Sequence, residues 1–294
     1  MHLLFVTDES YLQHLWVTLA SLFSNTSRRY SINIIDGGID EGKKEKLSSF
    51  AEDQGSTIRY LKFDTRLFQG YKISLHVTEA VYYRILAPNL LNELDKVLYL
   101  DCDLLVNRDL APLYELAIER YLVAAVENAD PEFDNKRRNK LGMPPNSPYF
   151  NSGVMLMNLK KMRNTKFSSK VLDFLQNNTK KIKYWDQDGL NVIAAKNWLP
   201  LHPKWNLQTN MIFNSYRMFT YDEREMNDAI QDPFIIHYTN SSKPWDYMND
   251  HPYKSEYWKY LAKTPFSSYS PLDYNLVNMV KKNVSKLKKR VLLK

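Results

Sequence analysis

A continuous apolar run in the middle of the chain ends at an acidic triplet. Residues 96–100 are Lys-Val-Leu-Tyr-Leu, and Asp101-Cys102-Asp103 follows directly. A strand without polar alternation is typical of a parallel sheet that helices cover on both faces. In open sheets of this kind, ligands bind outside the carboxyl ends of the strands. The run therefore predicts an α/β fold and places Asp101 and Asp103 where chemistry is expected.

The first hundred residues alternate short apolar runs with helical patterns, which predicts a parallel sheet with crossover helices. Strands are expected at 3–6, 31–35, 57–63 and 96–100, and helices at 11–23, 42–54 and 78–86. Farther along, a strand is expected at 150–158, helices at 167–176 and 186–195, and a last strand at 233–236. Residues 130–148 are polar and rich in Pro, Asn, Lys and Arg, which predicts a mobile surface excursion.

Composition narrows the class of protein. Hydrophobic residues make up 44% of the 294 positions and charged residues 25%, which is ordinary for a soluble globular protein. The single cysteine, Cys102, cannot form an internal disulfide, and the first residues lack the pattern of a signal peptide. No apolar run reaches the roughly 20 residues that a membrane-spanning helix needs. These features predict a cytoplasmic protein.

The excess positive charge lies at one end of the chain. Of the 40 basic residues, seven fall in 281–294, where there is no acid, and the remaining 33 balance the 33 acidic residues. This distribution argues against a nucleic-acid-binding protein with a basic face.

The same C-terminal segment has a helical apolar stripe, formed by Leu276, Val280, Val284, Leu287 and Val291. A basic amphipathic helix of this kind predicts peripheral contact with an anionic membrane, on the inner face for a cytoplasmic protein, or docking on a partner. The alternative is a solvated helix with a frayed end. Residues 1–262 are therefore predicted to form the main domain, and 263–294 a C-terminal basic amphipathic extension.

Three residues at strand ends and one lysine beyond them are candidates for a metal and phosphate site. Asp101 and Asp103 can converge on one hard cation, and His237 follows the last predicted strand. Lys243 follows six residues later and can reach a phosphate oxygen. On spacing alone, turn residues, a capped strand end and a surface lysine explain the pattern equally well. The other histidines, His2, His14, His76, His202 and His251, are expected to be packing or surface residues.

Six segments carry a resemblance to a known family. They are Phe5-Val6-Thr7-Asp8, Tyr83-Arg84-Ile85-Leu86, the run from Val97 to Asp103, Tyr149-Phe150-Asn151-Ser152-Gly153-Val154, Trp185-Asp186-Gln187-Asp188-Gly189-Leu190-Asn191, and His237 through Trp245. In this order, across residues 1 to about 250, the sequence resembles the retaining glycosyltransferases of family 8. That group includes glycogenin and bacterial lipopolysaccharide galactosyltransferases.

The resemblance implies a GT-A fold, a single Rossmann-like domain with a central mixed sheet, that binds a UDP-hexose and Mn²⁺, with Mg²⁺ as the alternative ion. By analogy Asp101, Asp103 and His237 ligate the metal and Lys243 holds the diphosphate. Asp8 faces the uracil, with Thr7, Ser10 and Tyr11 around the base and ribose. The donor sugar is lined by Arg84, Asn151, Asp186 and Gln187, and the last two are the candidate catalytic residues. The simpler alternatives are that Arg84 only forms a salt bridge and that Asn151 only forms a turn.

The family retains the anomeric configuration, and the residue type at Gln187 bears on the mechanism of that retention. A double displacement needs a carboxylate nucleophile, but this position is an amide, which is a poor nucleophile. Front-face attack by the acceptor, with the departing phosphate taking its proton, is therefore the preferred hypothesis.

Two positions depart from the family pattern. Asn240 stands where glycine is usual, in the loop whose backbone approaches the phosphates. Cys102 stands where a larger apolar residue is common. Both substitutions bear on the rate of the reaction and remove no ligand.

The leading hypothesis is transfer of a hexose, galactose in preference to glucose, from UDP to a glycan in a bacterial cell. The acceptor is expected on a lipid or on a serine-rich surface protein. A nucleotidyltransferase is the alternative enzyme, but it would need a glycine-rich basic loop where Thr7-Asp8-Glu9 stands. An inactive glycan-binding protein is the non-enzymatic alternative, against which the intact Asp101, Asp103, His237 and Lys243 argue.

Overall fold

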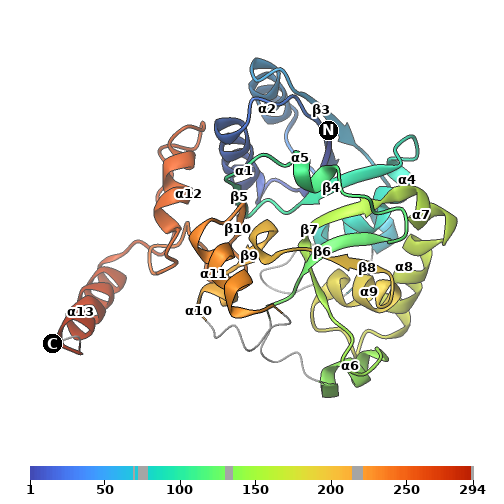
Figure 1. Ribbon diagram of the computed structural model, residues 1–294. Helices are drawn as coiled ribbons and strands as arrows, with labels where there is room; N and C mark the ends of the chain where they lie inside the picture. Colours follow the sequence, from blue (N-terminus) through green and yellow to red (C-terminus); the bar gives the residue numbers. More distant parts are fainter. Residues whose placement is uncertain (69, 72–78, 130–134, 214–220, 293–294) are drawn as a thin grey trace.

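A seven-stranded mixed sheet lies at the centre of the computed structural model, which describes residues 1–68, 70–71, 79–129, 135–213 and 221–292 (Figure 1). Within these residues the spatial order of the strands is β3-β2-β1-β4-β7-β6-β8. Their bounds are β1 His2–Thr7, β2 Ser31–Asp36, β3 Thr57–Leu61, β4 Lys96–Leu100, β6 Val123–Glu127, β7 Phe150–Asn158 and β8 Trp198–Pro200.

The first four strands of this sheet are parallel, as the alternating pattern predicts. The strand β7 then runs antiparallel to both β4 and β6, and β8 is parallel to β6. The predicted strand at 150–158 is thus confirmed as the element that makes the sheet mixed. The sequence analysis missed β6 and β8, which are short and, in β6, contain two alanines that favour strands weakly.

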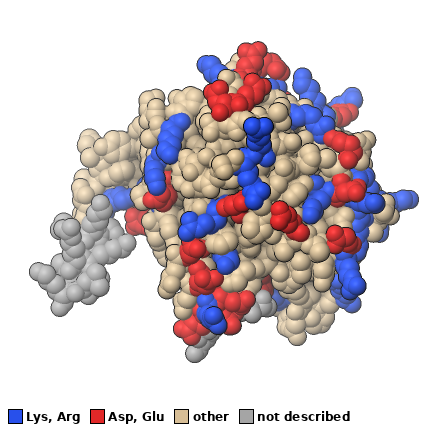
Figure 2. Space-filling model, turned by 45° about the horizontal axis from the view of Figure 1, so that its top comes forward, with Lys and Arg blue, Asp and Glu red and all other residues tan. Residues whose placement is uncertain are grey.

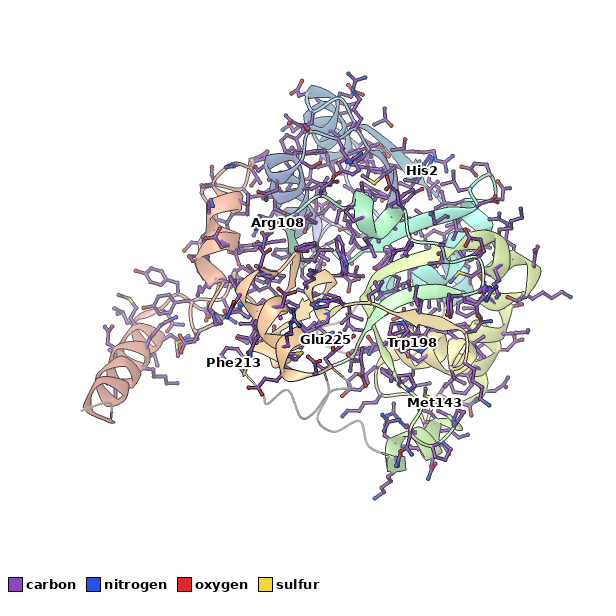
Figure 3. All side chains as sticks on the ribbon, in the orientation of Figure 1. His2, Arg108, Met143, Trp198, Phe213 and Glu225 are labelled. Carbon is purple, nitrogen blue, oxygen red and sulfur yellow. The ribbon has the colours of Figure 1, made fainter. Side chains whose placement is uncertain are left out.

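Helices cover both faces of the sheet. On one face, alternate strand residues such as Leu3 and Phe5 pack against α1 (Leu12–Asn25) and α2 (Glu41–Asp53). On the other, Leu4 and Tyr99 belong to a second core that includes side chains of α7 (Leu159–Asn164), α8 (Phe167–Asn177) and α9 (Trp185–Ala194). Trp198 of β8, labelled in Figure 3, packs edge-on against Phe150 of β7. Burial on both faces explains the apolar run of β4.

A second sheet of three strands lies beside the first and has the order β5-β10-β9. Its strands are β5 Leu104–Val106, β9 Leu207–Gln208 and β10 Ile235–His237. The strand β10 is the one predicted at 233–236, and it pairs antiparallel with β5, the segment directly after the acidic triplet.

The remaining helical segments have fewer than ten residues each, except α13, which has 17. They are η1 Thr65–Phe68, α3 Ala80–Tyr83, η2 Arg84–Leu86, α4 Ala87–Leu90, α5 Ala111–Tyr114, α6 Asn135–Leu141, η3 Pro203–Trp205, α10 Thr209–Phe213, α11 Glu223–Gln231, α12 Lys254–Leu261 and α13 Leu276–Leu292. The helix expected at 78–86 is confirmed over residues 80–86, where the α-helical turn α3 continues directly into the 3-10 turn η2. Pro88 lies in the first turn of α4, where its missing N–H costs no hydrogen bond.

In its described part, the surface excursion predicted at 130–148 contains a short helix, α6, at residues 135–141, which the sequence analysis missed. Its mobility stays a prediction. Leu141 and Met143 are buried with Tyr149 in a small core of their own. Two apolar side chains of this polar segment thus anchor it against Tyr149, and the polar composition obscured them. Residues 130–134 lie outside the described part.

The C-terminal segment begins as part of the body and ends away from it. Phe266 and Tyr269 pack against a core cluster that includes residues of α1, α12 and β10. In Figure 1 the helix α13 projects away from the body, and its Lys282 donates to the carbonyl oxygens of Tyr247 and Asn249. The boundary predicted at residue 262 stays a prediction. None of the described helices is long and apolar enough to cross a membrane.

On the face shown in Figure 2, basic and acidic side chains are interspersed over the globular body. Ion pairs join some of them, for example Arg108, labelled in Figure 3, and Asp232, whose charged atoms lie 2.6 Å apart.

Candidate active site

Strand pairing in the small sheet brings His237 beside the acidic triplet. The register of β5 and β10 places His237 opposite Leu104. The backbone N–H of Tyr238 donates to the carbonyl oxygen of Asp103, at 3.0 Å. Two segments that are far apart in the sequence are thereby held together at the carboxyl end of β4.

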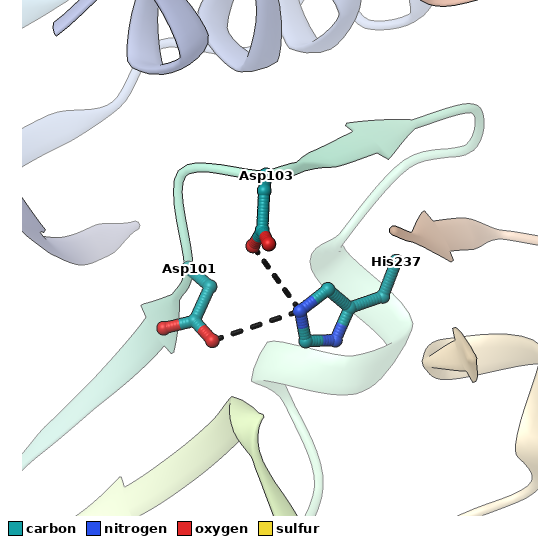
Figure 4. Close-up of side chains that lie close together, drawn as sticks. All are labelled: Asp101, Asp103 and His237. Carbon is teal, nitrogen blue, oxygen red and sulfur yellow. Dashed lines mark ion pairs between the residues drawn. The ribbon is translucent and has the colours of Figure 1, made fainter. Parts of the chain in front are cut away.

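Asp101, Asp103 and His237 point toward one another (Figure 4). The Nε2 atom of His237 lies 3.6 Å from Oδ2 of Asp101 and 3.2 Å from Oδ1 of Asp103. One ligand atom from each residue lies within 4.8 Å of the other two. Carboxylate oxygens suit Mn²⁺ and Mg²⁺, and an imidazole nitrogen can complete such a set. These three residues could therefore hold a divalent cation.

Lys243 adds a positive charge at the edge of this group. Its Nζ atom lies 2.6 Å from Oδ2 of Asp103 and donates to the carbonyl oxygen of Tyr238 at 2.7 Å. Burial alone would raise the pKa of Asp103, but Lys243 and His237 outweigh it, so the pKa of this carboxyl lies well below its usual range. Asp103 is thus held ionised, as a metal ligand must be.

Arg84 connects two carboxylates inside the site. Its guanidinium is buried, with Nη1 2.9 Å from Oδ1 of Asp101 and Nε 2.8 Å from Oδ2 of Asp186. Burial raises the pKa of Asp186 to about 7, although Arg84 acts to lower it. Arg84 does form the salt bridges that the simpler alternative predicts. Through those salt bridges, Arg84 connects Asp101, a candidate metal ligand, to Asp186, a residue expected at the donor sugar.

The first turn of α9 carries both candidate catalytic residues. The Oε1 atom of Gln187 accepts hydrogen bonds from the backbone N–H and the hydroxyl of Ser152, at 2.9 and 3.2 Å. Asp188 is fully buried and accepts from the backbone N–H groups of Lys183 and Tyr184, at 2.7 and 2.9 Å. Asp188 thus fixes the start of α9, and β7 fixes the amide of Gln187.

A tight turn after β1 presents the residues expected at the nucleoside. The Oδ1 atom of Asp8 accepts from the backbone N–H groups of Ser10 and Tyr11, at 3.0 and 3.2 Å, and from the Ser10 hydroxyl at 2.5 Å. Thr7, at the end of β1, is buried. Burial, and then the negative charges of Asp103 and Asp101, raise the pKa of the Tyr11 phenol. Tyr11 therefore stays a neutral donor beside the acidic group.

Cys102 fills the space between β1 and β4. It is buried, and its Sγ atom lies 3.2 Å from the carbonyl oxygen of Val6, to which the thiol donates. Burial raises the pKa of this thiol well above its usual value. The residue is therefore a small packing side chain and no nucleophile.

Asn240 has the backbone conformation that glycine adopts most easily. Its φ angle is +78°, in the left-handed region, which asparagine tolerates better than most residues. Its side chain donates to Oδ1 of Asn210 at 2.9 Å. The departure from the family pattern therefore keeps the shape of this turn.

All of the predicted site residues line two adjoining hollows. The smaller, of about 150 Å³, is lined by Thr7, Asp8 and Cys102. The larger, of about 960 Å³, is lined by Ser10, Asn151, Asp186, Gln187, His237, Asn240 and Lys243. Tyr11, Arg84, Asp101 and Asp103 line both. His76 lies outside the described residues.

The larger hollow is also lined by residues that the sequence analysis did not predict as part of the site. His14 lines it and is stacked on Trp245, with ring centroids 3.4 Å apart. Gln208 and Asn210 contribute amides, and Asn206 lies behind them, bonded to His237. These three amides occupy every second position of the chain, but only Gln208 lies in the strand β9, whereas Asn206 follows η3 and Asn210 belongs to α10.

Residues 2–249 match the family model described as glycosyl transferase family 8. The chain belongs to this family. This family 8 protein is 32% identical over 275 residues to general stress protein A of Bacillus subtilis, a match that covers 91% of this chain and 95% of the relative. It is 28% identical over 284 residues to a lipopolysaccharide 1,2-glucosyltransferase of Escherichia coli K12, covering 95% and 83% of the two chains.

The crystal structure of the galactosyltransferase LgtC, in complex with donor and acceptor sugar analogs, resembles this protein with a TM-score of 0.83. The two sequences are 23% identical, and the match covers 93% of this chain and 99% of LgtC. The likeness shows the GT-A fold, with its central mixed sheet. Family and fold together identify the protein as a glycosyltransferase, related to those that build lipopolysaccharide.

Proposed function

We propose that this family 8 glycosyltransferase transfers a hexose from UDP to a glycan, with retention of the anomeric configuration and with a divalent cation, Mn²⁺ in preference to Mg²⁺. The observation that carries the proposal is the convergence of Asp101, Asp103 and His237 on one point, with Lys243 at the edge of a large hollow. A bound cation supplies positive charge against the diphosphate and so makes UDP a better leaving group.

The chain's own residues have separate tasks in this proposal. Lys243 exchanges its contact with Asp103 for a phosphate oxygen and so adds a second positive charge beside the leaving group. The turn of Asp8, Ser10 and Tyr11 binds the uracil and ribose. Galactose is favoured as the donor sugar, with glucose as the alternative. Both sugars occur among the similar proteins, since the E. coli enzyme is a glucosyltransferase and LgtC a galactosyltransferase.

The residues at the sugar support front-face attack by the acceptor. The oxygen of Gln187 already accepts two hydrogen bonds from Ser152, which makes it a poorer nucleophile still. Asp186 is paired with Arg84. Its carboxyl accepts sugar hydroxyls in this proposal, while the departing phosphate takes the proton of the acceptor. A covalent glycosyl-enzyme trapped on Asp186 or Gln187 would overturn this part of the proposal.

The donor reaction is tested by measuring UDP release from UDP-galactose and UDP-glucose, with and without Mn²⁺. We expect release that depends on the cation and that Asp103→Asn abolishes, because the substitution removes a charged ligand and the partner of Lys243. Arg28→Gln is the matched control, since Arg28 forms an exposed ion pair with Asp109 on the surface. The absence of release from every UDP-hexose, with or without acceptor sugars, would refute the proposal.

The C-terminal helix supports contact with a membrane surface. In α13 the side chains of Leu276, Val280 and Val284 are 79%, 61% and 45% exposed, although all three are apolar. Lys281 and Lys282 lie between Val280 and Val284. We expect this helix to bind anionic lipid and hold the enzyme near a membrane-bound acceptor.

A further inference from the structure

His237 makes a hydrogen bond on the side of its ring away from the two carboxylates. Its Nδ1 atom lies 2.9 Å from Oδ1 of Asn206, and both residues are buried. The amide nitrogen of Asn206 lies 2.9 Å from Oδ1 of Asn151, and the amide nitrogen of Asn151 lies 3.1 Å from Oδ1 of Asn128. A chain of three side-chain amides therefore runs from His237 to the wall of the larger hollow.

One backbone group fixes the direction of these hydrogen bonds. The N–H of Gly153 can only donate, and it lies 3.0 Å from a side-chain atom of Asn151, so that atom must be the oxygen. The Asn206 atom that faces the same oxygen must then be its amide nitrogen, because two oxygens would repel each other. The oxygen of Asn206 consequently faces Nδ1 of His237, which must carry a proton.

We infer that Asn206 is a positioning residue for His237, which it acts on by holding a proton on Nδ1. The nitrogen that gives its lone pair to the cation is then Nε2, the atom that faces Asp101 and Asp103. A ligating histidine whose other nitrogen donates to a fixed acceptor is held in one tautomer and one orientation. The inference rests on the proposed cation site.

Gly153 contributes to the same arrangement through its lack of a side chain. A Cβ atom at this position would come within 2.1 Å of Cε1 of His237. The imidazole therefore lies directly against the backbone of β7, and Asn151, two residues earlier on that strand, receives the hydrogen bond that sets the direction of the chain. The cation ligand and a residue expected at the donor sugar thus form one hydrogen-bonded unit.

The test compares Asn206→Leu with Asn206→Asp in the full chain. Leucine has a similar size but accepts no hydrogen bond, so the proton on Nδ1 loses its acceptor. Aspartate still accepts from Nδ1 of His237 but cannot donate to Asn151. This variant should therefore keep the hydrogen bond to His237 and lose only the one to Asn151. Asn33→Leu is the matched control, because Asn33 is a buried amide that donates to the carbonyl oxygen of Leu3 at 3.1 Å, in the sheet away from the site.

Two quantities are measured. The first is the protonation of Nδ1 of His237, from its nitrogen resonances by NMR, without metal and with Zn²⁺ as a diamagnetic probe. The second is the affinity for Mn²⁺, from electron paramagnetic resonance. We expect a protonated Nδ1 in the unsubstituted protein and a Mn²⁺ affinity about 10–100-fold lower in Asn206→Leu. In Asn206→Asp most of the affinity should return, and Asn33→Leu should leave it unchanged.

An unprotonated Nδ1 in the unsubstituted protein would overturn the inference, and so would equal Mn²⁺ affinity in a folded Asn206→Leu protein. If Asn206→Leu does not fold, the test rests on Asn206→Asp. The inference is then overturned if Asn206→Asp binds Mn²⁺ as weakly as a variant that lacks one of the three metal-ligating side chains. Failure of the unsubstituted protein to bind Mn²⁺ or Zn²⁺ refutes the proposed cation site. Even then, the NMR measurement without metal decides where the proton lies.

Discussion

His14 is a buried histidine whose charge state affects stability. Its ring is stacked on Trp245, and Nδ1 lies 2.7 Å from the hydroxyl of Tyr257. Burial lowers the pKa of His14 to about 3, with smaller and opposite effects from Asp103, which raises it, and Lys243, which lowers it. In an unfolded chain the pKa of histidine is about 6.5. Between these two values the unfolded chain binds a proton that the folded protein does not bind.

The free energy of unfolding is therefore expected to fall as the pH drops from about 6.5 toward 3, by up to about 1.4 kcal/mol per pH unit. His14→Phe keeps a ring against Trp245 but has no proton to bind, so its stability should depend less on pH in this range. Urea denaturation of both proteins at several pH values measures the difference. Burial also lowers the pKa of His251, to about 4, which affects both proteins equally. Parallel stability curves would contradict the prediction.

Single residues differ in how far sequence could identify them. Asp101, Asp103 and Lys243 could be found because the family motifs contain them, whereas their positions after strands fit turn and cap residues equally well. His14 was expected to be a packing or surface residue, and it is packed, yet it also lines the hollow. Asn206 belongs to no motif that was identified. Its importance lies in its neighbours, His237 and Asn151, which are distant in the sequence.

At the scale of single elements, the turn at Asn240 can be tested by substitution. A left-handed conformation costs an ordinary L residue about 1–2 kcal/mol, so Asn240→Ala should destabilise the protein by about that amount. Asn240→Gly should be nearly neutral, because glycine adopts this φ freely but loses the hydrogen bond to Asn210. Chemical denaturation gives both values. Equal losses in the two variants would show that the side chain, and not the backbone angle, is what matters here.

Long periodic elements were predictable from sequence, and short ones were not. The helix α1 and the strand β4 are identified by continuous patterns that any packing would preserve. In contrast, β9 contains only two residues and β8 three, too few for a pattern. The helix α6 was missed for a related reason, since only Leu141 of its seven residues is buried.

At the scale of the whole molecule, the proposed membrane contact predicts that lipid binding can be removed without loss of the transfer reaction. Deletion of residues 276–294 should abolish binding to vesicles rich in an anionic lipid, because it removes the apolar stripe and all seven C-terminal basic residues. Each basic residue near such a surface contributes about 1 kcal/mol. UDP release in solution should be retained. Vesicle sedimentation at low and high salt measures binding, and neutral vesicles are the control.

Unchanged binding after the deletion would refute the role of the helix. Loss of UDP release would show instead that the helix supports the active site. A route for such an effect exists, because Lys282 of α13 donates to the carbonyl oxygens of Tyr247 and Asn249, close to the segment that carries Lys243.

The sequence by itself determined the α/β class, the parallel order of the first four strands and the chemistry that gathers at their carboxyl ends. These follow from local periodicity and from residue types, and both are properties of the chain alone. Only the tertiary structure decided that β5 and β10 pair, and so brought His237 to Asp103. It alone showed that Asn206 fixes the ring of His237 and that Arg84 joins Asp101 to Asp186. The physical reason is that strand pairing and buried hydrogen bonds depend on contacts between distant segments, which no local pattern contains.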